Sequence, residues 1–191
     1  MALILTGPPA VEPVTLAEAK AHLRIDNSSE DGLITSLVVT SRLHIEAALG
    51  LALIDQSLAY RLDRWPEAGA VVLPVRPVQT ITTVSMTAAD GTVETLSPDR
   101  YLLDGASTPP RLHALSPRWP RPGRCVQGIE IAFTAGFGAT ASAVPPPLRQ
   151  ALLQLVAHWY EHREPASVGE AVTRIPDMVS ALLMPYRMVR L

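Results

Sequence analysis

The sequence predicts an α+β protein whose N- and C-terminal helices form a small helical bundle with an inserted antiparallel β-region, either a small sandwich or an open barrel. Apolar residues recur at helical spacing near both ends of the chain, whereas the middle alternates with period two between turn residues. We therefore divide the chain into N-terminal helices (1–50), the β-region (51–143), and C-terminal helices with a tail (144–191). The length of 191 residues is typical of one compact domain with a subdomain.

Two helices are predicted in the N-terminal part. Thr15 and Glu18 form a capping-box pattern, so a short helix should follow and end at about Leu23. A second helix should open at Ser28–Asp31, where acidic residues suit the positive end of the helix dipole, and Gly50 suits the position after its last turn. Its predicted buried stripe comprises Leu33, Ile34, Leu37, Val38, Ser41, Ile45, Ala48 and Leu49.

Short strands are predicted through the middle of the chain. Leu58, Tyr60 and Leu62 alternate with other residues, as in a half-buried strand. Asp90-Gly91 is a typical hairpin turn between two further strands. The remaining strands are predicted over 71–73, 78–86, 93–96, 101–103, 111–115 and 128–133.

The C-terminal part predicts two more helices. One begins in the run Pro145–Pro147 and should end near Glu164, because the residue before Pro165 avoids the α region. The other begins near Pro176-Asp177 and should be broken by Pro185. Its predicted apolar face consists of Met178, Val179, Leu182 and Leu183.

The first of these helices carries His158, Glu161 and His162, which spell the inverted zinc-protease pattern H-x-x-E-H. Histidines at this spacing share a helical face, so a zinc-dependent hydrolase is one interpretation. A catalytic zinc needs a third protein ligand, and the acids that follow (Glu164, Glu170 and Asp177) lie in no second helical motif. We favour the interpretation that these side chains occupy the solvated face of an amphipathic helix, with no metal and no catalytic role.

Composition excludes several other functions. The net charge of −2 argues against general binding to nucleic acid or to an acidic membrane. No phosphate-binding motif or apolar run long enough to span a membrane is present, and the lone Cys125 lacks a partner motif. The N-terminus lacks the pattern of a signal peptide. We therefore expect a cytoplasmic protein with no cofactor and no membrane contact.

One acid-free segment is rich in arginine and contains Trp119. Its basic residues are Arg111, His113, Arg118, Arg121 and Arg124. The segment is either a solvated, proline-stiffened loop or a contact loop, since Arg and Trp are enriched at interface hot spots. Such a loop would touch a neighbouring subunit or DNA passing nearby.

The order of several short motifs carries a resemblance that covers nearly the whole chain. These are P-V-T-L-A-E-A-K-A-H-L-R-I, E-D-G-L-I, L-P-V-R-P-V, Y-L-L-D, F-T-A-G-F-G, V-P-P-P-L-R-Q-A, H-W-Y-E-H-R-E and L-L-M-P-Y-R. In this order they look like the gp6-like head–tail connector family of tailed phages, prophages and gene transfer agents.

The resemblance implies a structural adaptor and no enzymatic activity. Family members form a ring under the portal, extend the channel through which packaged DNA passes without sequence-specific binding, and present a platform for a stopper or another neck or tail component. The ring is expected to be dodecameric, although the free chain could be a monomer. Assembly would take place in the bacterial cytoplasm, and the final location would be the head–tail junction of the particle. Another neck component, such as a stopper or tail-completion protein, remains an alternative.

The short amphipathic tail suits docking, and we predict that it orders on the portal with Tyr186 and Arg187 as anchors. The alternative is that it packs back on its own helices. Residues predicted to bind the portal or a neighbouring subunit are Met178, Leu182, Pro185, Tyr186, Arg187, Met188, Val189, Arg190 and Leu191, together with Arg118, Trp119 and Arg121 of the arginine-rich segment.

Overall fold

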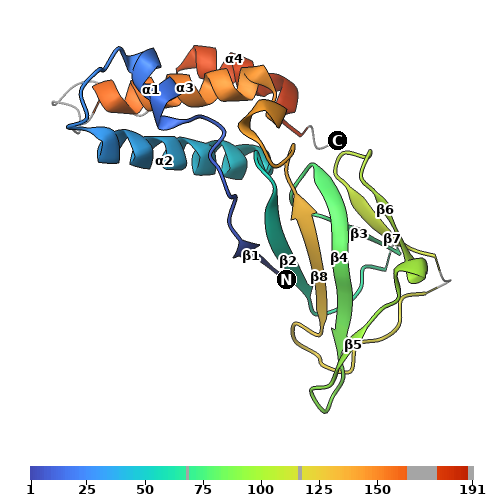
Figure 1. Cartoon of the computed structure of the whole chain (residues 1–191). Coiled ribbons are helices and arrows are strands. Elements are labelled where there is room, and N and C mark those ends of the chain that lie inside the picture. The colour runs from blue at the N-terminus through green and yellow to red at the C-terminus, as the bar shows by residue number, and fades with distance from the viewer. Residues whose placement is uncertain (68, 116–117, 163–175, 189–191) are drawn as a thin grey trace, which may run out of the picture. The chain divides into compact units, whose positions relative to one another are not determined.

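The chain forms two compact units, one built from strands and one from helices (Figure 1). The computed structural model describes residues 1–67, 69–115, 118–162 and 176–188. The β unit comprises Met1–Ala10 and Gly50–Ala139, and the helical unit comprises Val11–Leu49 and the described residues from Thr140 onward. The predicted α+β class is confirmed.

The β unit contains two antiparallel sheets. The larger has the order β1-β2-β8-β4-β5, with β8 between strands from much earlier in the chain. Its strands are β1 (Ala2–Gly7), β2 (Gln56–Leu62), β4 (Val78–Thr87), β5 (Val93–Thr95) and β8 (Ile129–Ala135). The smaller has the order β3-β7-β6, with β3 at Ala70–Val72, β6 at Tyr101–Asp104 and β7 at Arg111–Ala114; the short 3-10 helix η1 (Pro98–Arg100) precedes β6.

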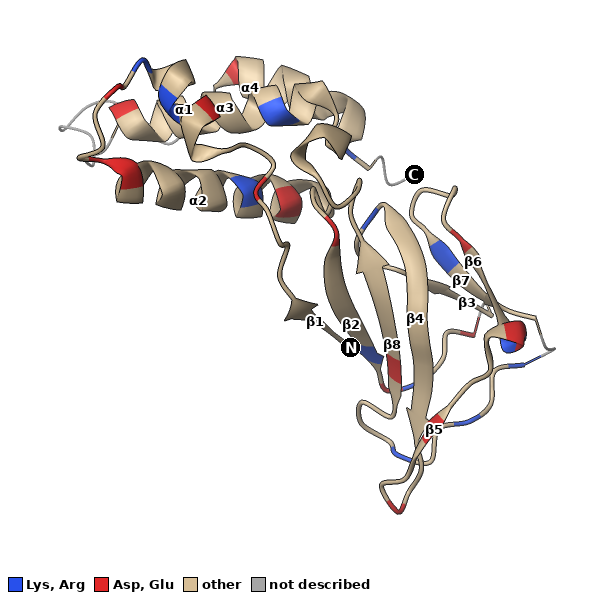
Figure 2. Cartoon of the chain, in the orientation of Figure 1, with Lys and Arg blue, Asp and Glu red and all other residues tan. Residues whose placement is uncertain are grey.

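The two sheets of the β unit share one buried cluster. Every second residue of β8 is buried, which is the period-two pattern of a strand with one face in the core. Phe133 on this face belongs to the same cluster as Val71 of β3 and Leu112 of β7. Charged residues are absent from β4, whereas the neighbouring strands β2 and β8 carry Arg61 and Glu130 (Figure 2).

Strand β1 was not predicted from the sequence. It lies at the edge of the larger sheet, and Leu3, Ile4 and Leu5 are exposed by 42%, 37% and 49%. Because side chains on both faces of β1 are exposed, its sequence does not show the alternation that marks the other strands. The other predicted strands are all present, and Asp90-Gly91 forms the turn between β4 and β5, where the Asp90 carboxylate accepts a hydrogen bond from the Thr92 amide.

The helical unit contains α1 (Leu16–Leu23), α2 (Asp31–Leu49), α3 (Pro146–Glu161) and α4 (Asp177–Leu183), with short 3-10 helices η2 (Ala141–Ala143) and η3 (Met184–Tyr186). The predicted capping box of α1 is confirmed: the Glu18 amide donates to Thr15 Oγ1, and the Thr15 amide donates to Glu18 Oε2. The predicted conformation of Gly50 after α2 is confirmed by its φ of +63°. Helix α3 contacts the other three helices.

The predicted stripe of α2 is correct in part. Ile34, Val38, Ser41, Ile45 and Leu49 are buried, but Leu33 and Ala48 are exposed.

Arg42 and Glu46 of α2, which are not part of the predicted stripe, are buried as well. Arg42 lies 2.7 Å from a carboxylate oxygen of Glu12 and 2.9 Å from one of Glu46. A buried charge is tolerated when it is paired and hydrogen-bonded, which hydrophobic periodicity alone does not reveal.

The C-terminal helices also differ from prediction in detail. In α3 the buried residues are Leu148, Ala151, Leu152, Leu155 and Val156, while Trp159 and Tyr160 are half-buried. Residues 163–175, where the predicted end of this helix falls, lie outside the described residues.

Pro185 does not end the helical conformation at α4, because it sits inside the 3-10 turn of η3. Val179 and Leu183 are buried, whereas Met178 is 58% exposed, so only part of the predicted apolar face of α4 packs inside the unit.

By length and composition alone, α2 is apolar enough to cross a membrane, with a mean hydropathy of 1.2 in its best window. This is weak evidence, since the central helix of a packed unit passes the same test. Helix α2 contacts α1 and α3 and carries the paired Arg42 and Glu46, which are features of a core helix.

Candidate assembly surfaces

His158 and His162 lie one turn apart on α3, as their spacing requires. Their ring centroids are 4.6 Å apart, and His162 Nδ1 lies within hydrogen-bonding distance, 2.8 Å, of the His158 backbone oxygen. Burial and the nearby His162 lower the pKa of His158, while Glu161 acts in the opposite direction. Among the described residues no group of three His, Cys, Asp or Glu side chains could hold a metal ion; Glu164 and Glu170 lie outside them. The zinc interpretation therefore gains no third ligand from the described part of the chain.

A pair of stacked tryptophans joins two loops of the β unit. Trp65 follows β2 and Trp119 lies in the arginine-rich segment before β8; their ring centroids are 4.2 Å apart and their planes differ by 9°. The Trp65 indole N–H donates to the Pro120 carbonyl at 2.7 Å, and the Trp119 indole N–H donates to the Gly69 carbonyl at 2.9 Å. The only polar group of each ring, its indole N–H, is thus hydrogen-bonded to a backbone carbonyl of the opposite loop.

Each tryptophan is the centre of an Arg-Trp-Pro triplet, Arg64–Pro66 in one loop and Arg118–Pro120 in the other. We call the two triplets and their stacked rings the RWP clasp. Of the two triplets, only Arg118 and Trp119 of the second are predicted from the sequence as contact residues. The first triplet could have been recognised from the sequence, because Arg-Trp-Pro occurs twice in a chain that has only three tryptophans. Both rings also pack against the buried cluster of the β unit, so Trp119, predicted as a contact residue, already has an intramolecular role.

An open cleft with a volume of about 800 Å³ is formed at the clasp. Its charged and titratable lining residues are Arg64, Glu67, His113, Arg118 and Arg121. The two tryptophans, Pro66 and Pro122 contribute apolar surface. The cleft therefore combines three cations with apolar walls, in a chain whose net charge is −2.

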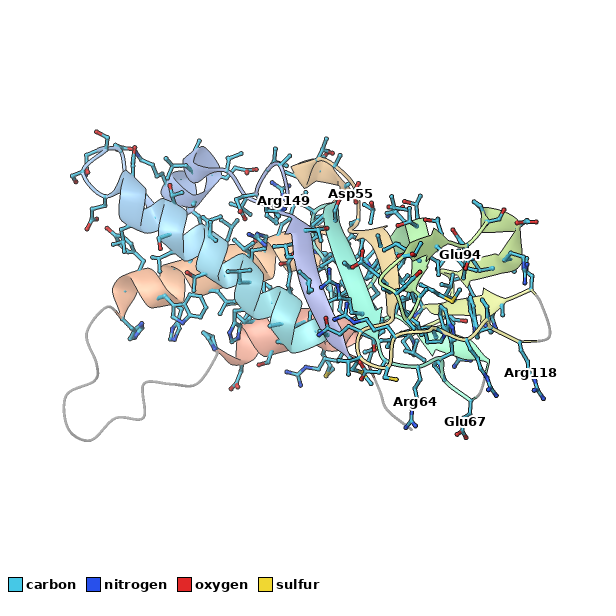
Figure 3. The ribbon with its side chains drawn as sticks, turned by 90° about the horizontal axis from the view of Figure 1, so that it is seen from below. Asp55, Arg64, Glu67, Glu94, Arg118 and Arg149 are labelled. Atoms are coloured by element: carbon cyan, nitrogen blue, oxygen red, sulfur yellow. The ribbon has the colours of Figure 1, made fainter. Side chains whose placement is uncertain are left out.

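The three arginines of the cleft are exposed, and no described residue forms a side-chain hydrogen bond or ion pair with them. By contrast, Arg61 of the neighbouring strand β2 is paired with Glu130 at 2.7 Å. In Figure 3, Arg64, Glu67 and Arg118 point away from the ribbon on the same side of the β unit. The arginines of the cleft thus remain exposed and form no salt bridge with the described part of the chain.

The loop that carries Arg121 is fixed by backbone contacts on both sides. The Gln127 amide donates to Asp63, which lowers the pKa of that carboxyl group, and the Gly123 and Arg124 amides donate to the Thr87 carbonyl. A Cβ atom on Gly123 would lie 2.5 Å from a backbone nitrogen of the β4–β5 turn, so this close approach requires glycine. These contacts hold the cleft in a defined shape.

The predicted C-terminal contact residues form a second surface, on the helical unit. Met178 and Met184 are 58% and 67% exposed, and Pro185 and Arg187 are exposed as well. Leu182, Tyr186 and Met188 are half-buried, while Val189, Arg190 and Leu191 lie outside the described residues. We call Met178, Met184, Pro185, Tyr186 and Arg187 the C-terminal surface. Large exposed apolar side chains beside an exposed cation are typical of an interface.

Comparison with known proteins finds one family model and several solved structures of particle chains. The model of the phage gp6-like head–tail connector protein family matches residues 13–92. A search of curated proteins found no match.

Among solved structures, a chain in the virion of a native gene transfer agent particle is 30% identical, with a TM-score of 0.84; the match covers 100% of this chain and 97% of that chain. A chain in the neck of an empty particle, computed with C6 symmetry, is 31% identical with a TM-score of 0.84, and the match again covers 100% and 97%. A third, in the neck of a native particle computed with C12 symmetry, is 31% identical with a TM-score of 0.79 over 98% and 97%. The protein therefore belongs to the phage gp6-like head–tail connector family.

Proposed function

We propose that this connector is the adaptor of a particle neck, where twelve copies form a ring under the portal, extend the DNA channel and link head to tail. The observation that carries the proposal is the match of the whole chain, at 30–31% identity, to chains of a gene transfer agent virion and neck, one of them computed with C12 symmetry. Its role would be structural rather than catalytic. The adaptor would be made in the bacterial cytoplasm and end at the head–tail junction.

The two units would have different roles in the neck. The helical unit would be the bundle that meets the portal, and the β unit would be the inserted part that larger adaptors carry. In a ring of identical copies, each contact joins two different patches and is closed by rotation. The packaged DNA would pass through the ring without being read, consistent with the net charge of −2.

The C-terminal surface is our candidate for the portal contact. Val179 and Leu183 anchor α4 in its own unit, while Met178, Met184 and Arg187 remain exposed. A partner that covers these side chains would bury apolar area at little cost to the adaptor's own packing. Tyr186 and Arg187 would be the anchors, and the tail up to Leu191 would become ordered on docking.

The proposal is tested by the mass of the purified chain in solution, measured by light scattering alone and after mixing with the portal encoded beside it. A monomer that joins the portal ring with twelvefold stoichiometry is expected. No association with an intact portal ring would overturn the proposal and favour a stopper or tail-completion protein.

Deletion of residues 188–191 tests the docking surface. The truncated chain should bind the portal more weakly while its thermal unfolding midpoint stays nearly unchanged, because Met188 follows the last described turn, η3, and is only half-buried. The matched control is Leu102→Ser, which removes an apolar side chain that is 56% exposed on the β unit and should leave portal binding intact. A large loss of stability with unchanged portal binding would contradict the assignment.

A further inference from the structure

We propose that the cleft at the RWP clasp binds an extended acidic segment of the neck protein that follows the adaptor ring. This inference rests on the proposed adaptor function, since it needs a neighbouring neck component. The portal contact was assigned to the helical unit, so the cleft, which lies wholly in the β unit, remains available for a different partner.

The charge of the cleft is what selects an acidic partner. Arg64, Arg118 and Arg121 line it, and no described residue forms a salt bridge with any of them. The pKa of the neighbouring Asp63 is lowered mainly by the hydrogen bond from the Gln127 amide and also by the charge of Arg64. A guanidinium group offers several N–H donors in a planar fork that matches a carboxylate. Carboxylates entering the cleft would therefore find donors that need not first break a salt bridge within the described chain.

The cleft is also held ready for binding. The stacked rings of Trp65 and Trp119 and their two indole hydrogen bonds fix the two loops to each other. The amides of Gly123 and Arg124, which bind the Thr87 carbonyl, fix the second loop to the end of β4. The two loops would therefore lose little conformational freedom when a peptide binds, which lowers the entropic cost of association.

The shape favours a peptide over DNA. A cleft of about 800 Å³ lies in the size range of sites that enclose a small group or a short segment, and a duplex could touch only its rim. The two tryptophans use one face each against the other, which leaves no open pair of rings for stacking bases. Glu67 on the same rim would repel a continuous row of phosphates, whereas a peptide can place its carboxylates away from it.

A second copy of the chain fits the cleft less well than another protein. The most acidic short run among the described residues is that around Asp26, Glu30 and Asp31. Asp31 is already paired with Lys20, and Glu30 accepts a hydrogen bond from Tyr160. Its acids are thus largely engaged inside the helical unit.

The experiment measures binding of a short fluorescein-labelled peptide of alternating glutamate and alanine residues to the full chain by fluorescence anisotropy. A glutamine version of the peptide and a short DNA duplex serve as competing probes. Arg64→Ala and Arg118→Ala should each weaken binding of the glutamate peptide by about tenfold, the scale of one hydrogen bond to a charged group. Arg100→Ala makes the same change of charge at an exposed η1 residue outside the cleft and should leave binding unchanged.

Circular dichroism establishes that each variant is folded before its binding is compared. Binding that is equally weakened by Arg100→Ala, or absent in the parent chain, would overturn the inference. If the DNA duplex bound more tightly than the glutamate peptide and also depended on Arg64 and Arg118, the cleft would be a nucleic-acid site and the peptide inference would be wrong.

Portal association of the same variants separates this inference from the proposed function. If Arg64→Ala and Arg118→Ala join the portal ring normally but lose the peptide, both proposals are supported. If the parent chain joins the portal but does not bind the peptide, only the present inference fails. If the parent chain does not join the portal, the adaptor proposal fails whatever the peptide does.

Discussion

Replacement of Trp119 by alanine should destabilise the β unit by roughly 2.5–3.5 kcal/mol. A fully buried tryptophan costs about 3–5 kcal/mol on truncation to alanine, and Trp119 is only half-buried, so we take about half of that value. The lost stacking with Trp65 adds about 1 kcal/mol. The Gly69 carbonyl, which loses its indole donor, lies in an exposed loop and can bind water, so its penalty is small.

The measurement is urea unfolding followed by far-ultraviolet circular dichroism, with the free energy obtained by linear extrapolation. Trp65→Ala and the double variant complete a cycle. Because the rings pack on each other, the second substitution should cost less than the first, with a coupling free energy of about 1 kcal/mol. Arg121→Ala, an exposed side chain on the same loop, is the control and should change the free energy of unfolding by less than about 0.5 kcal/mol.

Additivity of the two tryptophan substitutions to within about 0.3 kcal/mol would refute the clasp as a stabilising unit. The clasp would also be refuted if Trp119→Ala lowered the free energy of unfolding no more than the Arg121→Ala control does. Either result would mean that the two loops are held by their backbone contacts alone.

Three further outcomes are expected. Arg42→Met should cost about 3–5 kcal/mol in urea unfolding, because it leaves the buried Glu46 without this cation, and adding Glu46→Leu should recover part of the loss; no recovery would contradict the ion-pair account. Glu18→Gln should lower stability by about 0.5 kcal/mol at neutral pH, because glutamine can keep the capping hydrogen bond but loses the charge that pairs with Arg149. Because the hydrogen bond from the Thr15 amide lowers the pKa of Glu18, its contribution is present above the unfolded pKa near 4.5 and is lost as the pH falls through the lower folded value. The difference between parent and variant urea midpoints should therefore shrink in acid, and a constant difference would argue against it. Gly123→Ala should unfold at lower urea because its Cβ would lie 2.5 Å from a backbone nitrogen, whereas Gly32→Ala, with open space on α2, should be neutral or stabilising.

Local patterns explain how far the fold could be predicted. The capping box at Thr15 and the glycine after α2 are set by residues close together in sequence, and the structure confirms both. The alternation predicted for β2 is correct only in part, because Ala59 is buried as well as Leu58, Tyr60 and Leu62. Strand β1 was missed because an edge strand exposed on both faces does not alternate. The continuation past Pro185 was missed because a 3-10 turn tolerates proline in its first residues.

The candidate sites depend on contacts between distant residues. The C-terminal and arginine-rich contact residues were predicted from composition, and their role at an interface stays a prediction. Trp65 could be linked to Trp119 only through the fold, since 50 residues separate Trp119 from the Gly69 carbonyl that it binds.

The sequence by itself determined the α+β class, most helices and strands, and the connector family, because periodicity, caps and motif order are local or linear properties of the chain. Only the tertiary structure decided which charges are buried and which are free. Arg42 and Arg64 look alike in the sequence, yet one is buried between Glu12 and Glu46 and the other lines an open cleft without a salt bridge to any described residue. The physical reason is that burial and pairing are set by side chains brought together across loops and helices, and a linear pattern does not contain those distances.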